Sequence, residues 1–134
     1  MMAHGTSEGS GIPSSFAGLD PAQIAIAERL LRLVRAVFGH PPDVIGDLGR
    51  LHECLREAAA RLPNQEPDPL GVVILRYGLS TGKPLTLGEV ARMLGYTRER
   101  IRMIEEEVIR QLKHPRYSRF LRASFYTHEA QERL

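Results

Sequence analysis

Base recognition is the chemistry that the side chains of residues 96–107, YTRERIRMIEEE, could perform. The segment carries Arg98, Glu99 and Arg102 close together. The forked guanidinium group of arginine can donate to two acceptors of guanine, and a carboxylate can accept from the amino group of cytosine. The same charges would also suit a helix face that contacts only solvent. The choice between the two interpretations depends on the elements that position these side chains.

Helix-capping signals bracket this segment. Thr86 and Glu89 have the spacing of a capping box, in which the threonine hydroxyl accepts from a first-turn amide and the glutamate reaches back to the cap amide. We expect that helix to stop at Gly95, after which Thr97 caps a longer helix that ends ahead of Pro115. A short capped helix, a tight glycine turn and a longer capped helix are the layout of a helix-turn-helix motif.

Apolar periodicity predicts which side chains of the two helices face inward. In the first helix the residues predicted to be buried are Leu87, Val90, Ala91 and Leu94. In the second helix the buried stripe is Ile101, Ile104, Val108 and Leu112. That stripe forces another set outward, namely Arg98, Glu99, Arg102, Met103, Glu106 and Arg110. Because the first turns of the second helix enter the major groove in such motifs, the outward set is suited to base contact.

The stretch TLGEVARMLGYTRERIRMIEEEVIRQLKHPRYSRFLR resembles region 4 of the sigma-70 family, the bacterial factors that direct RNA polymerase to promoters. VILRYGL, at residues 73–79, resembles the first half of the same region, so the resemblance covers residues 70–123. It implies an all-α fold with a C-terminal helix-turn-helix domain. The base-reading residues of the promoter -35 element would be Arg98, Glu99, Arg102 and Met103. Contacts to DNA phosphates are implied for Arg76, Thr86, Arg100 and Lys113.

Three departures from the family pattern change the expected DNA binding. Met103 stands where the family has glutamine, which leaves only an apolar contact, such as one to a thymine methyl group. Glu107 stands where the family usually has lysine, so a phosphate attraction becomes a repulsion. The segment LPNQEPDP replaces an LPxRE-type approach and adds prolines. We therefore expect promoter-like DNA binding that is weaker or altered in its sequence preference.

A second basic feature follows, with cations spaced by three residues and no acid among them: Arg110, Lys113, Arg116, Arg119 and Arg122. In the family, the end of this region docks on the flap of the polymerase β subunit and meets activators near the position of Arg110. Polymerase or activator contacts are therefore expected at Arg110, Arg116, Arg119, Phe120, Leu121 and Arg122. The apolar members, together with Phe125, would either supply the apolar part of that contact or belong to the core.

The chain before this region carries two further helical patterns. They run from Asp20 to Gly39 and from Asp43 to Leu62, and the short GHPPD link predicts that the two helices pack as a hairpin. Their apolar faces either bury each other or form a dimer or partner surface. The predicted organisation is a disordered Gly- and Ser-rich tail at 1–19, a two-helix segment at 20–62, a proline-rich linker at 63–69, and the helix-turn-helix domain at 70–134.

The charge distribution favours a polyanion partner for the C-terminal half. Residues 1–69 hold six arginines against nine acids, whereas residues 70–134 hold twelve Lys and Arg residues against seven acids. The formal net charge of +2 conceals this asymmetry.

Other functional classes find little support in the sequence. It has no run of about eighteen apolar residues and no basic leader followed by an apolar segment, so a cytoplasmic, nucleoid-associated protein is expected. Cys54, the single cysteine, lies in an apolar helical pattern and is predicted to be a core residue. The five histidines have no metal-ligand spacing with it, and no glycine-rich phosphate loop precedes a helix. We expect neither an enzyme nor a bound metal or other cofactor.

Two functional hypotheses remain open. In the first, the chain is a sigma region 4-like transcription regulator that binds -35-like promoter DNA, RNA polymerase, or both. In the second, it is a protein-binding factor that docks on the β flap or competes with sigma region 4 without specific DNA reading. A complete sigma factor also needs exposed aromatic residues that hold unpaired bases of the -10 element. With no tryptophan and little further length, this chain is expected not to be one, and residues 20–62 would supply a homodimer or partner surface.

Overall fold

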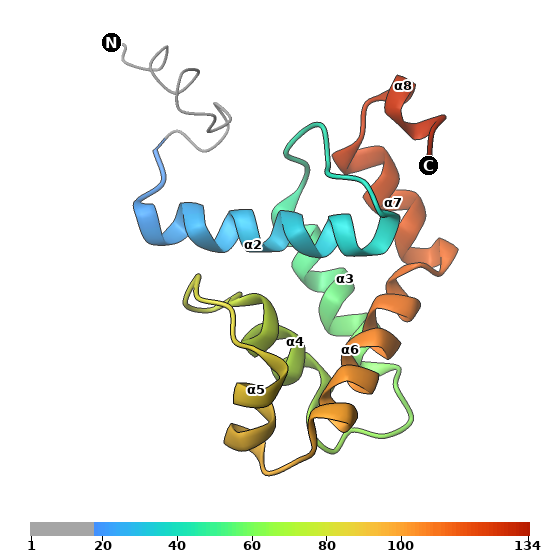
Figure 1. Cartoon of the computed structure of the whole chain (residues 1–134). Coiled ribbons are helices and arrows are strands. Elements are labelled where there is room, and N and C mark those ends of the chain that lie inside the picture. Colours follow the sequence, from blue (N-terminus) through green and yellow to red (C-terminus); the bar gives the residue numbers. More distant parts are fainter. Residues whose placement is uncertain (1–17) are drawn as a thin grey trace.

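The computed structural model describes residues 18–134, and every regular element in that part of the chain is an α-helix (Figure 1). The helices are α2 (Pro21–Phe38), α3 (Leu48–Ala60), α4 (Pro69–Tyr77), α5 (Leu87–Leu94), α6 (Arg98–Leu112), α7 (Pro115–Phe125) and α8 (His128–Gln131). The predicted all-α class is confirmed. The predicted tail, 1–19, lies outside the described residues except for Gly18 and Leu19. Among the helices of residues 18–134, none has the length and apolar character needed to cross a membrane.

Local capping defines the ends of the helices, as the sequence predicted. At the start of α2, the Asp20 carboxylate accepts from the Gln23 amide at 2.8 Å, and the Gln23 side chain accepts from the Asp20 amide at 2.9 Å. Gly39 ends that helix in the left-handed conformation, with φ of 80°, which a side chain with a Cβ rarely adopts. The same kind of glycine, Gly78, follows α4 with φ of 68°. These ends depend on residues no more than four positions away.

Helix α6 lies at the centre of the molecule and packs against α2, α3, α4, α5 and α7 (Figure 1). Its predicted apolar stripe is almost completely buried, and consists of Ile101, Ile104, Val108 and Leu112. Burial of one such side chain contributes about 1.5–3 kcal/mol to folding. Helix α6 is therefore the element whose orientation the core holds most firmly.

The two N-terminal helices, predicted to pack as a hairpin, contact each other but pack mainly on this core. Helix α2 lies across α4 and α6, and α3 packs against the same two helices (Figure 1). The apolar faces of α2 and α3 join one continuous buried cluster that extends as far as Ala130 near the C-terminus. Since α4 has only nine residues, it depends on neighbours such as α2 and α3 for its stability.

Helix α3 begins five residues later than the sequence predicted. Asp43 and Val44 donate from their amides to the carbonyl oxygen of Phe125, at 3.0 and 3.3 Å, and the Asp47 amide donates to Ser124 Oγ at 2.9 Å. These bonds tie the segment to the end of α7 instead of to a helical turn. Val44, predicted to lie on the buried seam, is exposed. Tertiary contacts to α7 have replaced the local helix that the apolar spacing suggested.

Hydrogen bonds and buried prolines hold the proline-rich segment 63–69 in place at both ends. Gln65 Nε2 donates to the carbonyl oxygens of Ala59 and Leu62, at 3.0 and 2.9 Å, and so completes the end of α3. Pro67 and Pro69 are buried. The segment connects α3 to α4 through ordered contacts rather than as a chain lying free in solvent.

Alanine substitutions at Gly46 and Gly49 test whether residues 43–47 pack against α7. A Cβ at Gly46 would overlap the side chain and carbonyl of Ser124, whereas a Cβ at Gly49 would meet only Asp47 Oδ1 at 3.5 Å. We expect Gly46→Ala to lower the free energy of unfolding by about 1–3 kcal/mol through overpacking. Gly49→Ala, in α3, should raise it by about 0.5–1 kcal/mol. Urea unfolding of both variants measures this, and equal stability of the two would contradict the packing.

Candidate nucleic-acid interface

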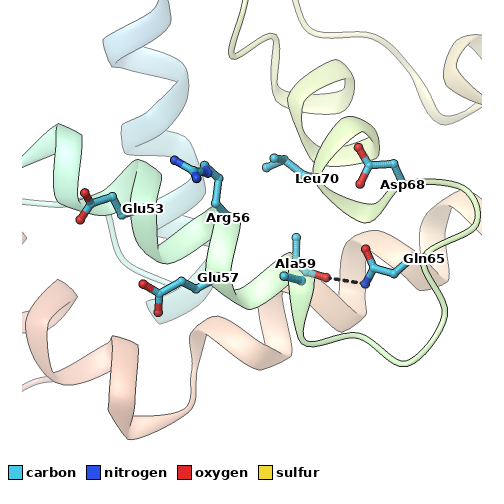
Figure 2. Close-up of a pocket in the computed structure, with 8 residues that line it drawn as sticks. Glu53, Arg56, Glu57, Ala59, Gln65, Asp68 and Leu70 are labelled. Carbon is cyan, nitrogen blue, oxygen red and sulfur yellow. Dashed lines mark hydrogen bonds between the residues drawn. The ribbon is translucent and has the colours of Figure 1, made fainter.

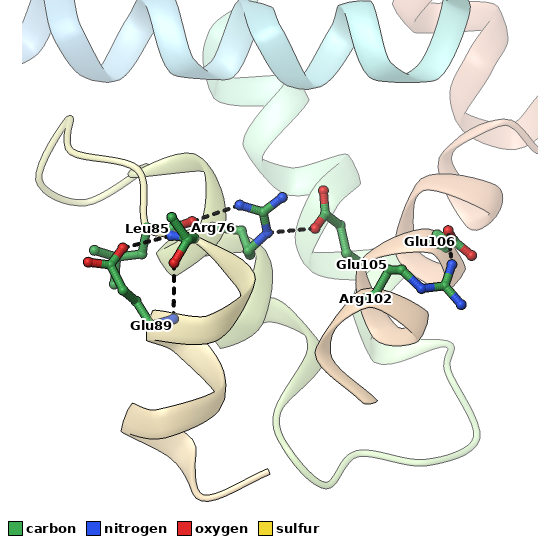
Figure 3. A network of polar contacts seen from close by, with 7 residues as sticks. Arg76, Leu85, Glu89, Arg102, Glu105 and Glu106 are labelled. Carbon is green, nitrogen blue, oxygen red and sulfur yellow. Dashed lines mark hydrogen bonds and ion pairs between the residues drawn. The ribbon is translucent and has the colours of Figure 1, made fainter. Parts of the chain in front are cut away.

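Helices α5 and α6 and the turn between them form a helix-turn-helix. The Thr86 hydroxyl accepts from the Glu89 amide at 3.1 Å, and the Glu89 carboxylate accepts from the Thr86 amide at 2.8 Å, which completes the predicted capping box (Figure 3). The pKa of Glu89 is lowered, chiefly by this bond from the Thr86 amide. Gly95 closes α5 with φ of 77°, and Thr97 Oγ1 accepts from the Arg100 amide at 3.1 Å. The turn is thus fixed by caps on both sides.

The predicted base-reading residues lie together on the outer face of α6. Arg98 and Glu99 occupy the first turn and are exposed, and Arg102 follows one turn later. Met103 is 43% exposed, which is high for a large apolar side chain. The buried stripe on the opposite side of the helix leaves these side chains no other direction. This arrangement presents guanidinium, carboxylate and methyl groups on one surface.

Arg102 is engaged by two carboxylates. Its Nε donates to Glu99 Oε1 at 3.1 Å and its Nη2 forms an ion pair with Glu99 Oε2. Its Nη1 forms an ion pair with Glu106 Oε2 (Figure 3). The hydrogen bond from Arg102 lowers the pKa of Glu99. The hydrogen bonds that Arg102 donates to Glu99 and Glu106 raise the pKa of Arg102, with the bonds to Glu99 the larger cause. In the protein without DNA, one of the predicted base-contacting arginines is therefore already paired.

Arg76, predicted to contact a phosphate, is instead placed in the interior. Its Nε donates to Glu105 Oε1 at 2.8 Å and its Nη1 donates to the carbonyl oxygen of Leu85 at 2.7 Å (Figure 3). The side chains of Arg76 and Glu105 are only 26% and 17% exposed. Tyr77, which follows Arg76, is half-buried, and its removal from water raises its pKa to about 12. Arg76 joins α4, α6 and the approach to α5, a structural role that the sequence-based prediction of a phosphate contact did not include.

The other predicted phosphate contacts occupy three different environments. Thr86 lies at the exposed N-terminus of α5 with its hydroxyl used by the cap. Arg100 is half-buried, and its Nη2 donates to the carbonyl oxygen of Glu66 at 2.9 Å. Lys113 is exposed at the far end of α6, about 22 Å along the helix from Arg98 at the rise of an α-helix. These three residues do not lie at one place on the surface.

The basic residues near the C-terminus are exposed, but most of their apolar neighbours are not. Among the predicted polymerase-contact residues, the exposed ones are Arg110, Arg116, Arg119 and Arg122. Leu121 is completely buried, as is Phe125, and Phe120 is half-buried beneath the guanidinium of Arg50 at 5.8 Å. The expectation that Leu121 contributes to an exposed docking surface is therefore wrong, because it packs in the core.

Exposed apolar residues near the turn were missed by the sequence-based analysis. Leu94, predicted to be buried, is 36% exposed, and its neighbours Met93 and Tyr96 are 61% and 38% exposed. Together with Met103, they make up four of the six large apolar side chains that are exposed in residues 18–134. The available signal was the cluster of apolar residues directly before Thr97, of which helical spacing assigned only Leu94 to the core.

A cavity of about 490 Å³ lies away from this face, between α3 and α4 (Figure 2). Glu53 and Glu57 border it on the α3 side, and Asp68 lies at the start of α4 (Figure 2). These carboxylates repel phosphate, and they belong to helices other than α5 and α6. Within residues 18–134, no three His, Cys, Asp or Glu side chains come together in a way that could hold a metal ion.

Comparisons with known proteins agree with the helix-turn-helix geometry. The model of the family described as Sigma-70, region 4 matches residues 58–114, which run from the last turn of α3 to the end of α6. The match begins upstream of residue 70, where the sequence resemblance was placed. The chain is also 43% identical over 72 residues to the RNA polymerase sigma factor SigA of Listeria monocytogenes and to that of Listeria innocua. These alignments cover 54% of this chain and 18% of each relative.

Replacement of Arg76 separates a structural role from a DNA contact. We expect Arg76→Ala to lower the free energy of unfolding by about 1–3 kcal/mol, because Glu105 then loses its partner in a mostly buried position. The matched control is Arg92→Ala, which removes an exposed arginine of α5. Urea unfolding measures the stability, and DNA titration of the folded variant measures binding. Unchanged stability with weaker DNA binding would return Arg76 to the phosphate contacts.

Proposed function

We propose that the protein regulates transcription by binding -35-like promoter DNA through α6, since residues 58–114 match the sigma-70 region 4 family. The observation that carries the proposal is the common exposed face of Arg98, Glu99, Arg102 and Met103. In a helix-turn-helix, this face of the second helix is the one that enters the major groove. The buried stripe of α6 holds the face in a fixed direction, so little ordering of the backbone is needed on binding.

Each residue of the face has a distinct chemical task in the proposed complex. Arg98 is in the first turn, and no carboxylate of residues 18–134 forms an ion pair with it. It is free to donate to both O6 and N7 of guanine. Glu99 can accept from the amino group of cytosine, and Met103 can contact the methyl group of thymine. Arg102 can also contact a base, provided that the base replaces a carboxylate partner of its guanidinium.

Phosphate contacts would position this face on the duplex. The N-termini of α5 and α6 are both open to solvent near Thr86 and Thr97, and helix N-termini attract phosphate through free amides and the helix dipole. Arg100 donates one hydrogen bond to Glu66 and has further N–H groups available. Such contacts fix the register of the protein on DNA, whereas the side chains of the α6 face supply the sequence preference.

The test is a fluorescence-anisotropy titration of a duplex carrying a consensus -35 element, alongside a scrambled duplex, at two salt concentrations. We expect a preference of about tenfold or more for the consensus and a steep salt dependence. Arg98→Ala should weaken consensus binding about 10- to 100-fold and reduce the preference, because a bidentate guanine contact is lost.

Arg56→Ala is the matched control for the loss of charge. Arg56 is exposed on α3 beside the cavity between α3 and α4, on a different face from Arg98. We expect this variant to bind the consensus duplex like the original protein. Equal loss in both variants, or an absence of preference in the original protein, would contradict base recognition by α6.

Polymerase binding is a second candidate function, favoured by the exposed cations at the end of α6 and along α7. Arg110, Arg116 and Arg119 are all exposed, and none forms an ion pair with a carboxylate of residues 18–134. Such a surface complements an acidic one, and the β flap is the proposed site on polymerase. Only the half-buried Phe120 would add apolar area, so the contact would be mainly electrostatic.

The outer face of α2 is the remaining candidate for a partner or homodimer contact. Its inner residues are buried in the core, including Leu33 and Val34. What remains outside is a shallow cavity of about 370 Å³ bordered by Glu28, Leu31, Arg32, Arg35, Pro41 and Pro42. A partner at this cavity would therefore meet side chains of both charges beside apolar ones, and not the apolar seams.

Charge reversal tests the polymerase contact. We expect the double variant Arg116→Glu/Arg119→Glu to lose co-purification with bacterial RNA polymerase core enzyme, because two attractions become repulsions. Binding to the -35 duplex should persist, since the N-terminal turns of α6 are unchanged. Arg56→Glu, with the same kind of charge reversal on α3, is the control and should still co-purify. Retained polymerase binding by the double variant would contradict this contact.

A further inference from the structure

Two carboxylates hold the guanidinium of Arg102 from opposite directions along α6. Glu99 lies three residues before Arg102 and Glu106 lies four residues after it, and such spacings bring side chains together on one helix face. Glu99 accepts hydrogen bonds from two nitrogens of Arg102. Glu106 accepts a bond from the third nitrogen (Figure 3). The two contacts therefore differ: Glu99 orients the whole fork, and Glu106 engages its other end.

The position of Glu106 makes it an obstacle to phosphate contact by Arg102. Its side chain is 54% exposed on the face that the DNA would approach, and that of Arg102 is 43% exposed. An unpaired arginine at a DNA surface forms a salt-dependent contact with any nearby phosphate, irrespective of sequence. An arginine paired to carboxylates has its charge neutralised and gains less from such a contact. A phosphate can also accept two hydrogen bonds from the fork, but the guanine acceptors lie in the major groove, on the path of the outward face of α6.

We propose that Glu106 is a specificity-determining residue that competes with DNA for Arg102. On DNA of nonspecific sequence, Glu106 keeps the guanidinium of Arg102 paired on α6, whereas at a specific site Arg102 exchanges Glu106 for a guanine. The inference rests on the proposed binding of DNA through α6. Glu99 keeps the fork oriented during the exchange, as a positioning residue. The competition by Glu106 weakens binding to nonspecific DNA more than binding to the specific site. It therefore increases specificity, which depends on the difference between the binding free energies for the two kinds of DNA.

Glu107 supplies a matched control for the removal of charge. It follows Glu106 directly in α6, is half-buried, and has no hydrogen bond or ion pair with Arg102. Glu106→Gln and Glu107→Gln each remove one negative charge from the same helix. A general change in electrostatic attraction to DNA would appear in both variants. Only the first variant removes a carboxylate partner of Arg102.

The experiment measures binding to consensus and scrambled duplexes across a range of salt concentrations. On the scrambled duplex, Glu106→Gln should make the slope of log affinity against log salt steeper by about 0.9, the value for one additional phosphate contact, whereas Glu107→Gln should not. On the consensus duplex, the extra gain of Glu106→Gln should be only about twofold, the contribution of one exposed helix ion pair. The preference for the consensus should fall accordingly.

A double substitution tests whether the effect passes through Arg102. In an Arg102→Ala background, Glu106→Gln and Glu107→Gln should have equal effects on binding and on the salt slope. Circular dichroism and urea unfolding of every variant establish that each is folded. Equal salt slopes of Glu106→Gln and Glu107→Gln in the presence of Arg102 would overturn the proposal.

The measurements distinguish a failure of base recognition by α6 from a failure of the role proposed for Glu106. If the protein shows no consensus preference, the proposed base recognition is wrong, yet the slope on the scrambled duplex still reports whether Glu106 withholds Arg102 from phosphate. If the preference exists and falls with Arg98→Ala, but the two glutamine variants behave alike, base recognition stands and the role of Glu106 is wrong.

Discussion

Burial of one apolar stripe on α6 is the constraint on which the rest of the structure depends. The stripe packs in a core that is built from helices before and after α6 in the sequence, from α2 to α7, and it consists of Ile101, Ile104, Val108 and Leu112. Rotation of α6 by even one residue position, about 100°, would bring charged side chains into that core. The cost of such a change fixes which side chains face outward. The charged face is therefore a consequence of packing on the opposite side.

The three consecutive glutamates of α6 illustrate how strongly this orientation separates neighbours. Glu105 turns toward α4 and pairs with Arg76 in a mostly buried position (Figure 3). Glu106 turns outward and pairs with Arg102, and Glu107 is half-buried without a contact to either arginine. A run that looks like a uniform acidic patch thus contributes one internal cross-link and one surface ion pair. Its effect on DNA binding depends on each residue separately.

The N-terminal helices change the physical setting of the region 4 segment. Helix α2 covers parts of α4 and α6, and the segment before α3 is bonded to the end of α7. Tyr126 adds a further tie, since its hydroxyl donates to the carbonyl oxygen of His40 at 2.5 Å. Segments on either side of residues 58–114 therefore stabilise the same core, and α6 is held in part by α2 and α7, which lie outside the matched region.

The sequence by itself determined the features that rest on neighbours within about one helical turn. These are the caps at Asp20, Thr86 and Thr97, the glycine ends of the helices, and the apolar stripe that exposes Arg98 and Arg102. The ion pairs of Arg102 with Glu99 and Glu106 have the same local spacing and were within reach of sequence reasoning, although they were missed. The period of the helix is enough to relate such residues in space.

Only the tertiary structure decided contacts between residues distant in the chain. Arg76 meets Glu105 across 29 positions, and the Asp47 amide meets Ser124 across 77. The same packing buries Leu121 and exposes Leu94, although both have apolar side chains at helical spacing. Periodicity identifies an apolar face but not the helix that will cover it, because that depends on how all the helices fill a shared volume. Base-contacting candidates could therefore be named from the sequence, whereas the roles of Arg76, Leu121 and Leu94 required the assembled core.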